Sequence, residues 1–303
     1  MNGVLVIDKP QDYTSFDVVA IVRRLARQKK VGHTGTLDPM ATGVLPLLLG
    51  TATRAQSLVP DTDKEYLASF QLGVTTDTQD STGTVLSKRE VQADRQRLEE
   101  ALSHFRGEIL QIPPMYSAVQ KDGVRLYDLA RKGMVVEREA RPICIYRLHL
   151  QDYDPKTGTG TMLVRCSKGT YIRTLCHDIG EWLGCGGMMT SLRRTIACGF
   201  SLEDSISLEE AKALAEEGNL ENRLRSTEGL FLGYPRVKVT EKQARRFQNG
   251  GGLMLDRIGI PQPYQEGTLY RVQDAHRNFV GLGMVSLEKQ ELLVKKLFDM
   301  GSK

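Results

Sequence analysis

The chain has 303 residues, of which 40% are hydrophobic and 26% charged, and a formal net charge of +4, as in an ordinary globular protein with an adequate core. No apolar run approaches the roughly 18 residues of a membrane-spanning helix and no signal peptide is visible, so we expect a cytoplasmic protein without a membrane partner. The five cysteines include no Cys-x-x-Cys pair, which predicts reduced, mostly buried thiols.

Charge alternates in blocks along the chain. Lys and Arg outnumber Asp and Glu by 7 to 4 in residues 1–60, by 13 to 8 in residues 121–198 and by 12 to 7 in residues 235–303. The two blocks between them are acidic. Residues 61–110 contain 6 Lys and Arg against 10 Asp and Glu, and residues 199–234 contain 3 Lys and Arg against 8 Asp and Glu. Positive blocks that converge on one face would offer a track to a polyanion, although segmented charge is also common on solvated surfaces.

The first 30 residues predict a strand followed by a helix. The apolar run from Val4 to Asp8 is ended by Lys9-Pro10, as in a buried strand. Thr14 or Ser15 supplies an N-cap, and apolar residues recur at helical spacing as far as Leu25. The helix tail holds five cations in eight residues, which are Arg23, Arg24, Arg27, Lys29 and Lys30. Cations suit a helix C-terminus whatever its function, but this cluster exceeds that need.

The segment from Val31 to Gly43 predicts an irregular loop, because it contains three glycines and a proline. Glycines let another molecule approach the backbone closely. Asp38 precedes Pro39, so its backbone is pushed toward the extended region. An Asp-Pro pair usually starts a turn and nothing more, which is the simpler interpretation. His33 lies in the same loop and is a candidate because loops often carry function.

The middle of the chain alternates strands and helices. Residues 44–49 form a buried segment closed by Gly50, and residues 64–73 alternate as in a half-buried strand, with Tyr66 facing the core or a cleft. Residues 74–86 predict a loop with a strand end, and a helix from about Asp94 to Arg106 stops at Gly107. Residues 109–118 are too rich in proline for a central strand, and a short basic helix follows at 125–132.

Residues 143–153 and 161–167 predict paired strands, which lead to a helix that starts at Tyr171 and ends at Gly184. Arg173 lies in its first turn. If buried, it needs an anionic partner such as Asp38 or a phosphate; if exposed, it makes an ordinary surface ion pair. Residues 188–198 predict a strand in which Leu192 is most simply a core residue.

A composition shift near Tyr234-Pro235 predicts two domains, residues 1–234 and 235–303. The first ends in an acidic stretch with a helix at about 208–217. The second contains one helix at 240–249 and strand-like runs at 269–273, 279–285 and 292–298. We expect a small, mostly β module.

Several familiar sites are missing, including a Walker loop, Gly-x-Ser-x-Gly, His-Glu-x-x-His and a complete Gly-x-Gly-x-x-Gly. Cys176, His177 and Cys185 lack zinc-like spacing, so no metal site is predicted. An aspartate can act as a nucleophile on a glycosidic centre, and a nearby arginine favours its ionised form. Aromatic rings would stack on a base and cations would hold phosphates, which points to base chemistry on a nucleic acid.

Six segments occur in the order found in the TruB family of bacterial tRNA pseudouridine-55 synthases, which residues 1–200 resemble. They are Lys9-Pro10 with Thr14-Ser15, Gly32 to Gly43, Lys64-x-Tyr66, Pro113-Pro114-x-Tyr116-Ser117-Ala118, Lys168 to Arg173, and Leu192-Arg193-Arg194-Thr195. The resemblance implies an α/β (α+β) fold around a largely antiparallel mixed sheet, with a C-terminal RNA-binding module similar to a PUA domain. It also implies isomerisation of uridine 55 in the T loop of tRNA, without cofactor or metal.

The resemblance also implies roles for single residues. Asp38 corresponds to the nucleophile, Tyr66 to the tyrosine that stacks on the target base, and Arg173 to the arginine paired with the nucleophile. The remaining candidates for substrate or RNA binding are His33, Tyr171, Leu192 and Lys9. The expected partner is the T stem-loop of tRNA, bound by a monomer that needs no other protein.

Two features depart from the family pattern. Residues 185–189 (Cys-Gly-Gly-Met-Met) stand where the family has alanine and bulkier residues, so we expect a looser backbone there. The C-terminal module matches weakly, and its assignment depends on position and size. Two other functions remain open at this stage: a non-catalytic RNA-binding or RNA-folding protein, and a base-excising glycosylase, which is disfavoured because it would release free base.

Overall fold

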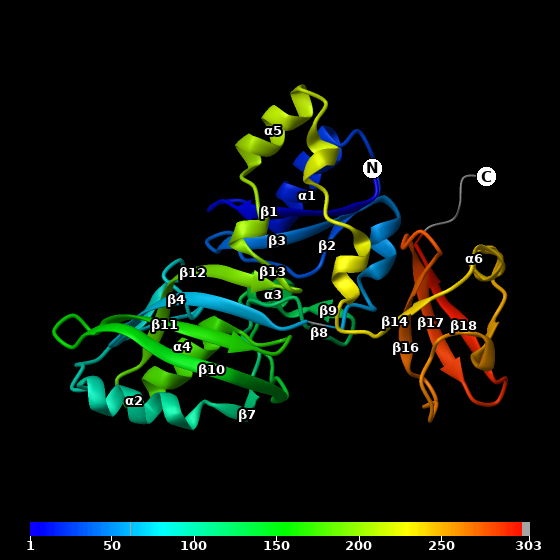
Figure 1. Ribbon diagram of the computed structural model, residues 1–303. Coiled ribbons are helices and arrows are strands. Elements are labelled where there is room, and N and C mark those ends of the chain that lie inside the picture. The colour runs from blue at the N-terminus through cyan, green and yellow to red at the C-terminus, as the bar shows by residue number, and fades with distance from the viewer. Residues whose placement is uncertain (61, 299–303) are drawn as a thin grey trace.

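A nine-stranded mixed sheet forms the centre of the N-terminal part of the chain (Figure 1). The computed structural model describes residues 1–60 and 62–298. The order along the sheet is β1-β3-β12-β4-β11-β10-β7, with β2 added to β3 and β13 to β12. Among the described strands of this sheet, β3 and β12 pair in parallel and the other neighbours pair antiparallel. The predicted α/β fold with a largely antiparallel sheet is therefore confirmed.

Most strands of this sheet agree with the sequence patterns, but the loop expected over residues 31–43 begins later than predicted. Residues 31–33, including His33, form strand β2 because they pair with the end of β3. The strands of the sheet are β1 (Gly3–Lys9), β2 (Val31–His33), β3 (Thr42–Leu49), β4 (Lys64–Leu72), β7 (Gly107–Gln111), β10 (Arg141–Asp154), β11 (Thr159–Cys166), β12 (Gly187–Ala197) and β13 (Phe200–Ser201). Strand β7 precedes the proline-rich segment and lies at the sheet edge, where a missing ladder donor is tolerated.

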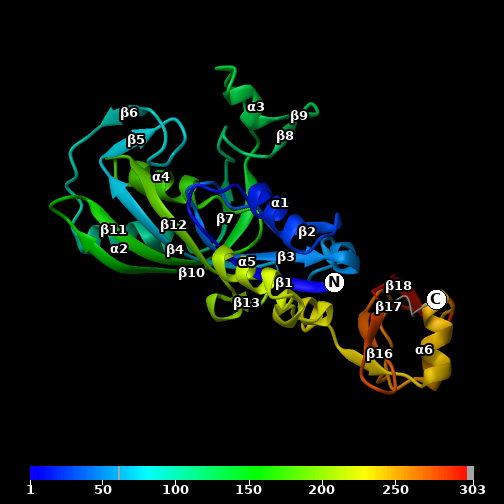
Figure 2. The same ribbon diagram turned by 90° about the horizontal axis from the view of Figure 1, so that it is seen from above.

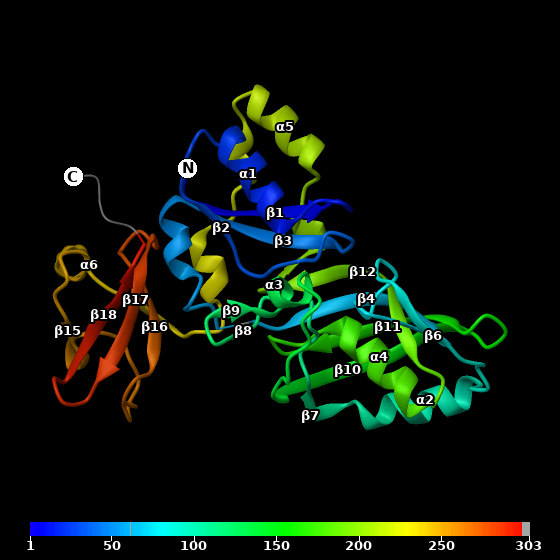
Figure 3. The same cartoon turned by 180° about the vertical axis from the view of Figure 1, so that it is seen from behind.

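Four helices pack against the sheet in two groups. Helices α2 (Arg95–His104) and α4 (Ile172–Trp182) lie together on the face that Figure 3 shows, while α1 (Ser15–Leu25) and α5 (Leu208–Glu216) lie near β1. Thr14 caps α1 in a reciprocal capping box with Asp17, which stabilises the predicted start of the helix. The buried face of α1 follows the apolar spacing of the sequence.

Strands β4 and β12 form the middle of the sheet and carry several candidate residues. Tyr66, Ala68 and the next alternate side chains of β4 are buried, as the period of two predicts. In β12, Leu192 lies opposite Ala68 and Arg194 lies opposite Tyr66. Since alternate residues of a strand share a face, these four side chains lie on one face of the sheet.

Two small hairpins extend from the sheet. One joins β5 (Val74–Thr76) to β6 (Val85–Lys88), and the other joins β8 (Gln120–Lys121) to β9 (Val124–Arg125). Helix α3 (Leu126–Ala130) follows β9, and the three elements project from the body in Figure 2. The helix expected over residues 125–132 is shorter because Arg125 pairs in the hairpin.

The C-terminal part forms a five-stranded sheet in the order β14-β16-β17-β18-β15 with one helix (Figure 1). Its elements are β14 (Arg236–Lys238), α6 (Glu241–Gln248), β15 (Leu253–Met254), β16 (Leu269–Gln273), β17 (Phe279–Ser286) and β18 (Glu291–Leu297). The small, mostly β module is therefore present. The boundary at residues 234 and 235 stays a prediction.

Polar and aromatic contacts join this module to the preceding segment. Phe231, in the 3₁₀ turn Thr227–Phe231, packs against Phe279 and Phe298 with ring centroids 5.8 and 5.3 Å away. Glu228 accepts hydrogen bonds from Arg271 Nη1 at 2.9 Å and Gln273 Nε2 at 2.7 Å. Both side chains of the Arg271–Glu228 ion pair are largely buried. This pair and the ring contacts hold the C-terminal module against the preceding segment.

The backbone at residues 185–189 is tightly packed, which corrects the expected looseness. A Cβ atom added to Gly180 of α4 would lie closer than 3.0 Å to the backbone of Gly186 and Gly187. A Cβ on Gly187 would lie 2.7 Å from the carbonyl oxygen of Cys176. The glycines therefore let the start of β12 lie directly against α4.

This close approach makes Gly180 a sensitive position. We expect Gly180→Ala to destabilise the protein by about 2 kcal/mol, because overpacking displaces backbone. Thermal unfolding should detect a fall in Tm of roughly 4–8 °C. The matched control is Gly259→Ala, since no atom lies within 4 Å of its added Cβ. Equal Tm values for the two variants would contradict the packing role.

Candidate active site

Asp38 and Arg173 meet between the loop after β2 and the start of α4. Arg173 Nε lies 3.2 Å from Asp38 Oδ2. The arginine side chain is 8% exposed, whereas the aspartate side chain is 41% exposed. The partner that the sequence left open for Arg173 is thus Asp38. The buried guanidinium of Arg173 therefore contacts one carboxylate oxygen of Asp38, and the exposed part of the aspartate side chain is accessible to a ligand.

Arg173 is fixed by further contacts, which the sequence did not predict. Its Nη1 lies 3.5 Å from Asp80 Oδ2, and its Nη2 donates to the carbonyl oxygen of Tyr116 at 2.8 Å. Asp80 is buried and accepts hydrogen bonds from Thr82 N at 3.0 Å and Thr78 Oγ1 at 2.8 Å. Arg173 Nη1 also donates to the carbonyl oxygen of Thr78 at 3.3 Å, so two carboxylates and two carbonyls satisfy a buried charge that would otherwise be costly.

The Asp38 loop is anchored on both sides of the aspartate. Leu37 N donates to Ser15 Oγ at 2.8 Å, which ties the loop to the start of α1. Lys9 Nζ donates to the carbonyl oxygen of Pro39 at 3.2 Å. Ala41 N donates to the Asp38 carbonyl oxygen at 3.0 Å, so the simple turn expected of Asp-Pro is also present. The carboxylate is thus presented from a fixed turn.

Lys9 supports the loop from the interior. It is fully buried, and its Nζ also donates to the carbonyl oxygens of Pro10 at 2.9 Å and Tyr13 at 2.6 Å. Three carbonyls use the three N–H groups of an ammonium, so none is left for RNA. The RNA-binding role expected for Lys9 is replaced by a supporting one. Burial lowers the pKa of Lys9 to about 8, against the opposing charge of Asp38.

The lowered pKa of Lys9 predicts a pH-dependent stability. The unfolded chain keeps this proton to about pH 10.5 and the folded chain to about pH 8. Between these values Lys9 holds its proton in the unfolded state only, so the contribution of Lys9 to stability rises with pH, by up to about 3 kcal/mol. Lys9→Met should lack this rise, and urea denaturation from pH 7.5 to 10 would measure the difference. The exposed Lys29→Met should retain it; a Lys9→Met variant that also retains it would refute the assignment.

Tyr66 and Leu192 lie on one face of the sheet, on the paired strands β4 and β12. Tyr66 is 6% exposed, and burial raises the pKa of its hydroxyl while the neighbouring Arg194 charge opposes the rise. The charge of Asp38 adds a smaller rise to the pKa of Tyr66. Leu192 is 9% exposed and belongs to the main core cluster, two residues from Arg194 on the same face.

Arg194 is a site residue that sequence reasoning missed. It is fully buried and donates from Nε to the Val44 carbonyl oxygen at 2.7 Å and from Nη2 to the Gly35 carbonyl oxygen at 3.2 Å. Gly43 (φ +103°) lies so close to the Arg194 backbone that no side chain fits. This glycine therefore serves strand packing. The alternation of β12 could have revealed Arg194, since an inward Leu192 implies an inward residue two positions later.

His33 and Tyr171 lie at the ends of two other elements, β2 and α4. His33 ends β2 and is half-buried; burial, and after it the charge of Arg194, lowers the pKa of its imidazole. Tyr171 is the N-cap of α4, and its backbone N–H donates to Gln111 Oε1 at 2.8 Å. Tyr171 is therefore held two residues before Arg173, and its side chain is half-buried.

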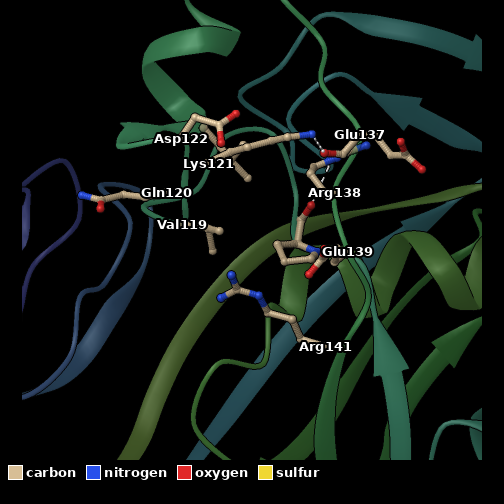
Figure 4. Close-up of a pocket in the computed structure, with 10 residues that line it drawn as sticks. Val119, Gln120, Lys121, Asp122, Glu137, Arg138, Glu139 and Arg141 are labelled. Carbon is tan, nitrogen blue, oxygen red and sulfur yellow. Dashed lines mark hydrogen bonds between the residues drawn. The ribbon is translucent and has the colours of Figure 1, made fainter.

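Asp38 does not line the cavity at the β8–β9 hairpin. A cavity of about 460 Å³ is bordered by the β8–β9 hairpin and residues 137–141, including Lys121, Glu137 and Arg138 (Figure 4). It contains none of the predicted site residues. Within residues 1–60 and 62–298, no three His, Cys, Asp or Glu side chains gather as metal ligands. In the same residues, no helix is both long and apolar enough to cross a membrane.

The chain matches two family descriptions along most of its length. Residues 23–172 match "TruB family pseudouridylate synthase (N terminal domain)", and residues 173–230 match "tRNA pseudouridylate synthase B C-terminal domain". The chain is 46% identical to "tRNA pseudouridine synthase B" of Pseudomonas fluorescens over 289 residues, covering 94% of this chain and 92% of the relative. It is 43% identical over 297 residues to the Clostridium tetani protein with that description, covering 95% and 97%.

Solved structures share the fold. A structure described as "Crystal Structure of a Cbf5-Nop10-Gar1 Complex" aligns with a TM-score of 0.76 at 27% identity, covering 98% of this chain and 85% of that one. A second, "Structure of H/ACA RNP bound to a substrate RNA containing 2'-deoxyuridine", aligns with a TM-score of 0.73 at 24% identity over the same shares. The similarity to this second structure is of fold alone.

Proposed function

Because the chain belongs to the TruB family of pseudouridine synthases, we propose that it converts uridine 55 in the T loop of tRNA to pseudouridine, with Asp38 as the nucleophile. Relatives described as tRNA pseudouridine synthase B support tRNA as the substrate. The reaction breaks the bond from C1′ to N1 of the base and forms a bond from C1′ to C5. The C5 proton is lost and N1 gains one, so the product is an isomer and no oxidant or reductant is needed.

The observation that carries this proposal is the Asp38–Arg173 pair. An ionised carboxylate can attack an electron-poor centre, either C6 of the base or C1′ of the ribose. Arg173 Nε, 3.2 Å from Asp38 Oδ2, holds the carboxylate in one orientation. The contacts of Arg173 to Asp80 and Tyr116 keep the guanidinium in place, so the nucleophile is preorganised.

A folded T loop hides its uridine, so we propose that the nucleotide is extruded to reach Asp38. Extrusion costs a few kcal/mol, which stacking and pocket contacts must recover. Tyr66 would stack on the base, Leu192 and Tyr171 would border it, and His33 would contact the RNA at the position that the base leaves. The side chains of Tyr66 and Leu192 share one face of the sheet, which supports this arrangement.

The proposal includes the organisation of the chain. Residues 1–234 would form the catalytic domain and residues 235–303 a PUA-like RNA-binding domain, whose last residues lie outside the described part. The separate C-terminal sheet and its positive block support this division. The protein would act as a cytoplasmic monomer on the T stem-loop, without cofactor or obligatory protein partner.

The decisive experiment is mass-spectrometric mapping of a T stem-loop transcript incubated with the purified protein. We expect pseudouridine at position 55 and at no other uridine. A transcript with cytidine 55 is the matched control and should stay unmodified. Release of free uracil would instead indicate a glycosylase, and binding without any product would favour a non-catalytic RNA-binding protein.

A further inference from the structure

The exposed face of α1 carries an aromatic ring at one end and arginines at the other. Phe16 is 69% exposed. Ala20, Arg23, Arg24 and Arg27 are also exposed and follow at spacings of four, seven, eight and eleven residues. These spacings place them along one side of the helix and the turn that ends it. The helical part of this stripe, from Phe16 to Arg24, is about 12 Å long at the rise of an α-helix.

The aromatic end adjoins the candidate active site. The rings of Phe16 and His33 meet edge to face with centroids 5.5 Å apart. Ser15, the neighbour of Phe16, is the residue whose Oγ accepts the hydrogen bond from Leu37 N. The helix start and the Asp38 loop are therefore one rigid unit. An exposed ring in this place offers its face to a partner, because its edge contact with His33 leaves most of its surface in solvent.

The basic end borders a shallow hollow. A space of about 600 Å³ is lined by Ala20, Arg23, Arg24, Arg27, Gln28 and Lys29. Arg23 Nη2 donates to the Val31 carbonyl oxygen at 2.9 Å, which fixes that side chain against β2. In the described part of the chain, no carboxylate forms an ion pair with any of these four cations. Their charge is therefore available to an anion.

The neighbouring helix limits where that anion can lie. Helix α5 packs beside α1 (Figure 1), and its exposed side chains include Glu209 and Glu216, while Glu210 pairs with Arg223. A polyanion is repelled from the α5 side. It is attracted to the side of α1 that carries the arginines, since opposite charges steer an approaching ligand.

We propose that the exposed face of α1 binds the RNA substrate beside the active site, with Phe16 stacking on a nucleotide base and Arg24 and Arg27 contacting backbone phosphates. This inference rests on the proposed function, and it adds a contact surface outside the pocket. A ring followed by unpaired cations suits RNA because every base has a face for stacking and every nucleotide a phosphate. The rigid link from Ser15 to Leu37 would align the bound nucleotides with Asp38.

Two variants and two matched controls test this surface by tRNA binding at several salt concentrations. Phe16→Ala should weaken binding by about tenfold or more without changing the salt dependence, because stacking is not ionic. The double variant Arg24→Gln/Arg27→Gln should reduce the slope of log affinity against log salt by about 1.4 to 1.8. The controls are Leu232→Ala, at 67% exposure, and Arg95→Gln/Lys156→Gln, exposed cations of α2 and the β10–β11 turn.

The outcomes separate this surface from the proposed function. Binding by both α1 variants within twofold of their controls, with an unchanged salt slope, would overturn the surface while wild-type pseudouridine formation stands. A wild-type protein that binds tRNA through α1 but forms no pseudouridine would overturn the proposed function and leave the surface intact. The variants change exposed side chains, so circular dichroism and Tm should match those of the wild type.

Discussion

Replacing Asp38 with asparagine is expected to abolish pseudouridine formation while tRNA affinity stays within about tenfold, or roughly 1.4 kcal/mol. The amide has the shape of the carboxylate, and its oxygen can still accept a hydrogen bond from Arg173 Nε. It cannot serve as a nucleophile, because it carries no negative charge. The single-turnover rate should fall by more than about a thousandfold, as expected when a nucleophile is removed.

The control is Asp12→Asn. Asp12 is an exposed carboxylate whose charge also acts on Lys9, and its backbone lies at φ +67°, a region that asparagine tolerates. This variant should keep its rate and its affinity for tRNA. Pseudouridine formation by the Asp38→Asn variant at a rate near that of the wild type would end the nucleophile assignment. Equal loss of binding and rate would indicate a structural role for the loop.

Much of the local structure follows from short-range sequence patterns. The period of two in β4 predicts the inward position of Tyr66, and the structure confirms it. Thr14, Asp17 and the apolar spacing predict α1, whose reciprocal cap the structure contains. These patterns are readable because the interactions join residues within one turn or one strand. They identify which side chains face inward, but not what those side chains meet.

The partners of buried charges could not be read in this way. Arg173 meets Asp38 and Asp80, which are 135 and 93 residues earlier in the sequence, and no local pattern distinguishes Asp80 from an ordinary loop aspartate. The family motif implied an RNA contact for Lys9, yet the turn at Pro39 encloses its ammonium. Whether such a charged side chain is buried depends on carbonyls and carboxylates that distant segments of the chain supply. Functional roles came from the ordered family motifs.

The glycines of the Asp38 loop illustrate the same limit. Sequence reasoning assigned all three to the approach of another molecule. Gly43 instead lies against the Arg194 backbone, while Gly32 has no atom within 4 Å of an added Cβ. Of these three glycines, Gly32 is the one with open space beside its Cα atom. The same residue type thus serves packing at one position and access at another, and the difference depends on which strand lies alongside.

Arg173→Lys is expected to lower the single-turnover rate by at least about a hundredfold while tRNA affinity changes by less than about fivefold. The guanidinium uses Nε for Asp38, Nη1 for Asp80 and Nη2 for the Tyr116 carbonyl oxygen. A lysine ammonium is a single point on a flexible stem and cannot reach both carboxylates in the same geometry. Asp38 then loses its fixed orientation, which matters for the chemical step more than for binding.

The variant should also be less stable, because Asp80 is buried and loses its ion-pair partner. We expect a loss of about 1–3 kcal/mol in urea denaturation, so the rate must be measured on protein verified as folded. Arg193→Lys is the matched control, since Arg193 pairs with Asp8 on β1 at 2.7 Å but is 40% exposed. That exchange should cost little in rate or stability. An unchanged single-turnover rate in Arg173→Lys would show that the arginine does not orient Asp38, and its burial would then be purely structural.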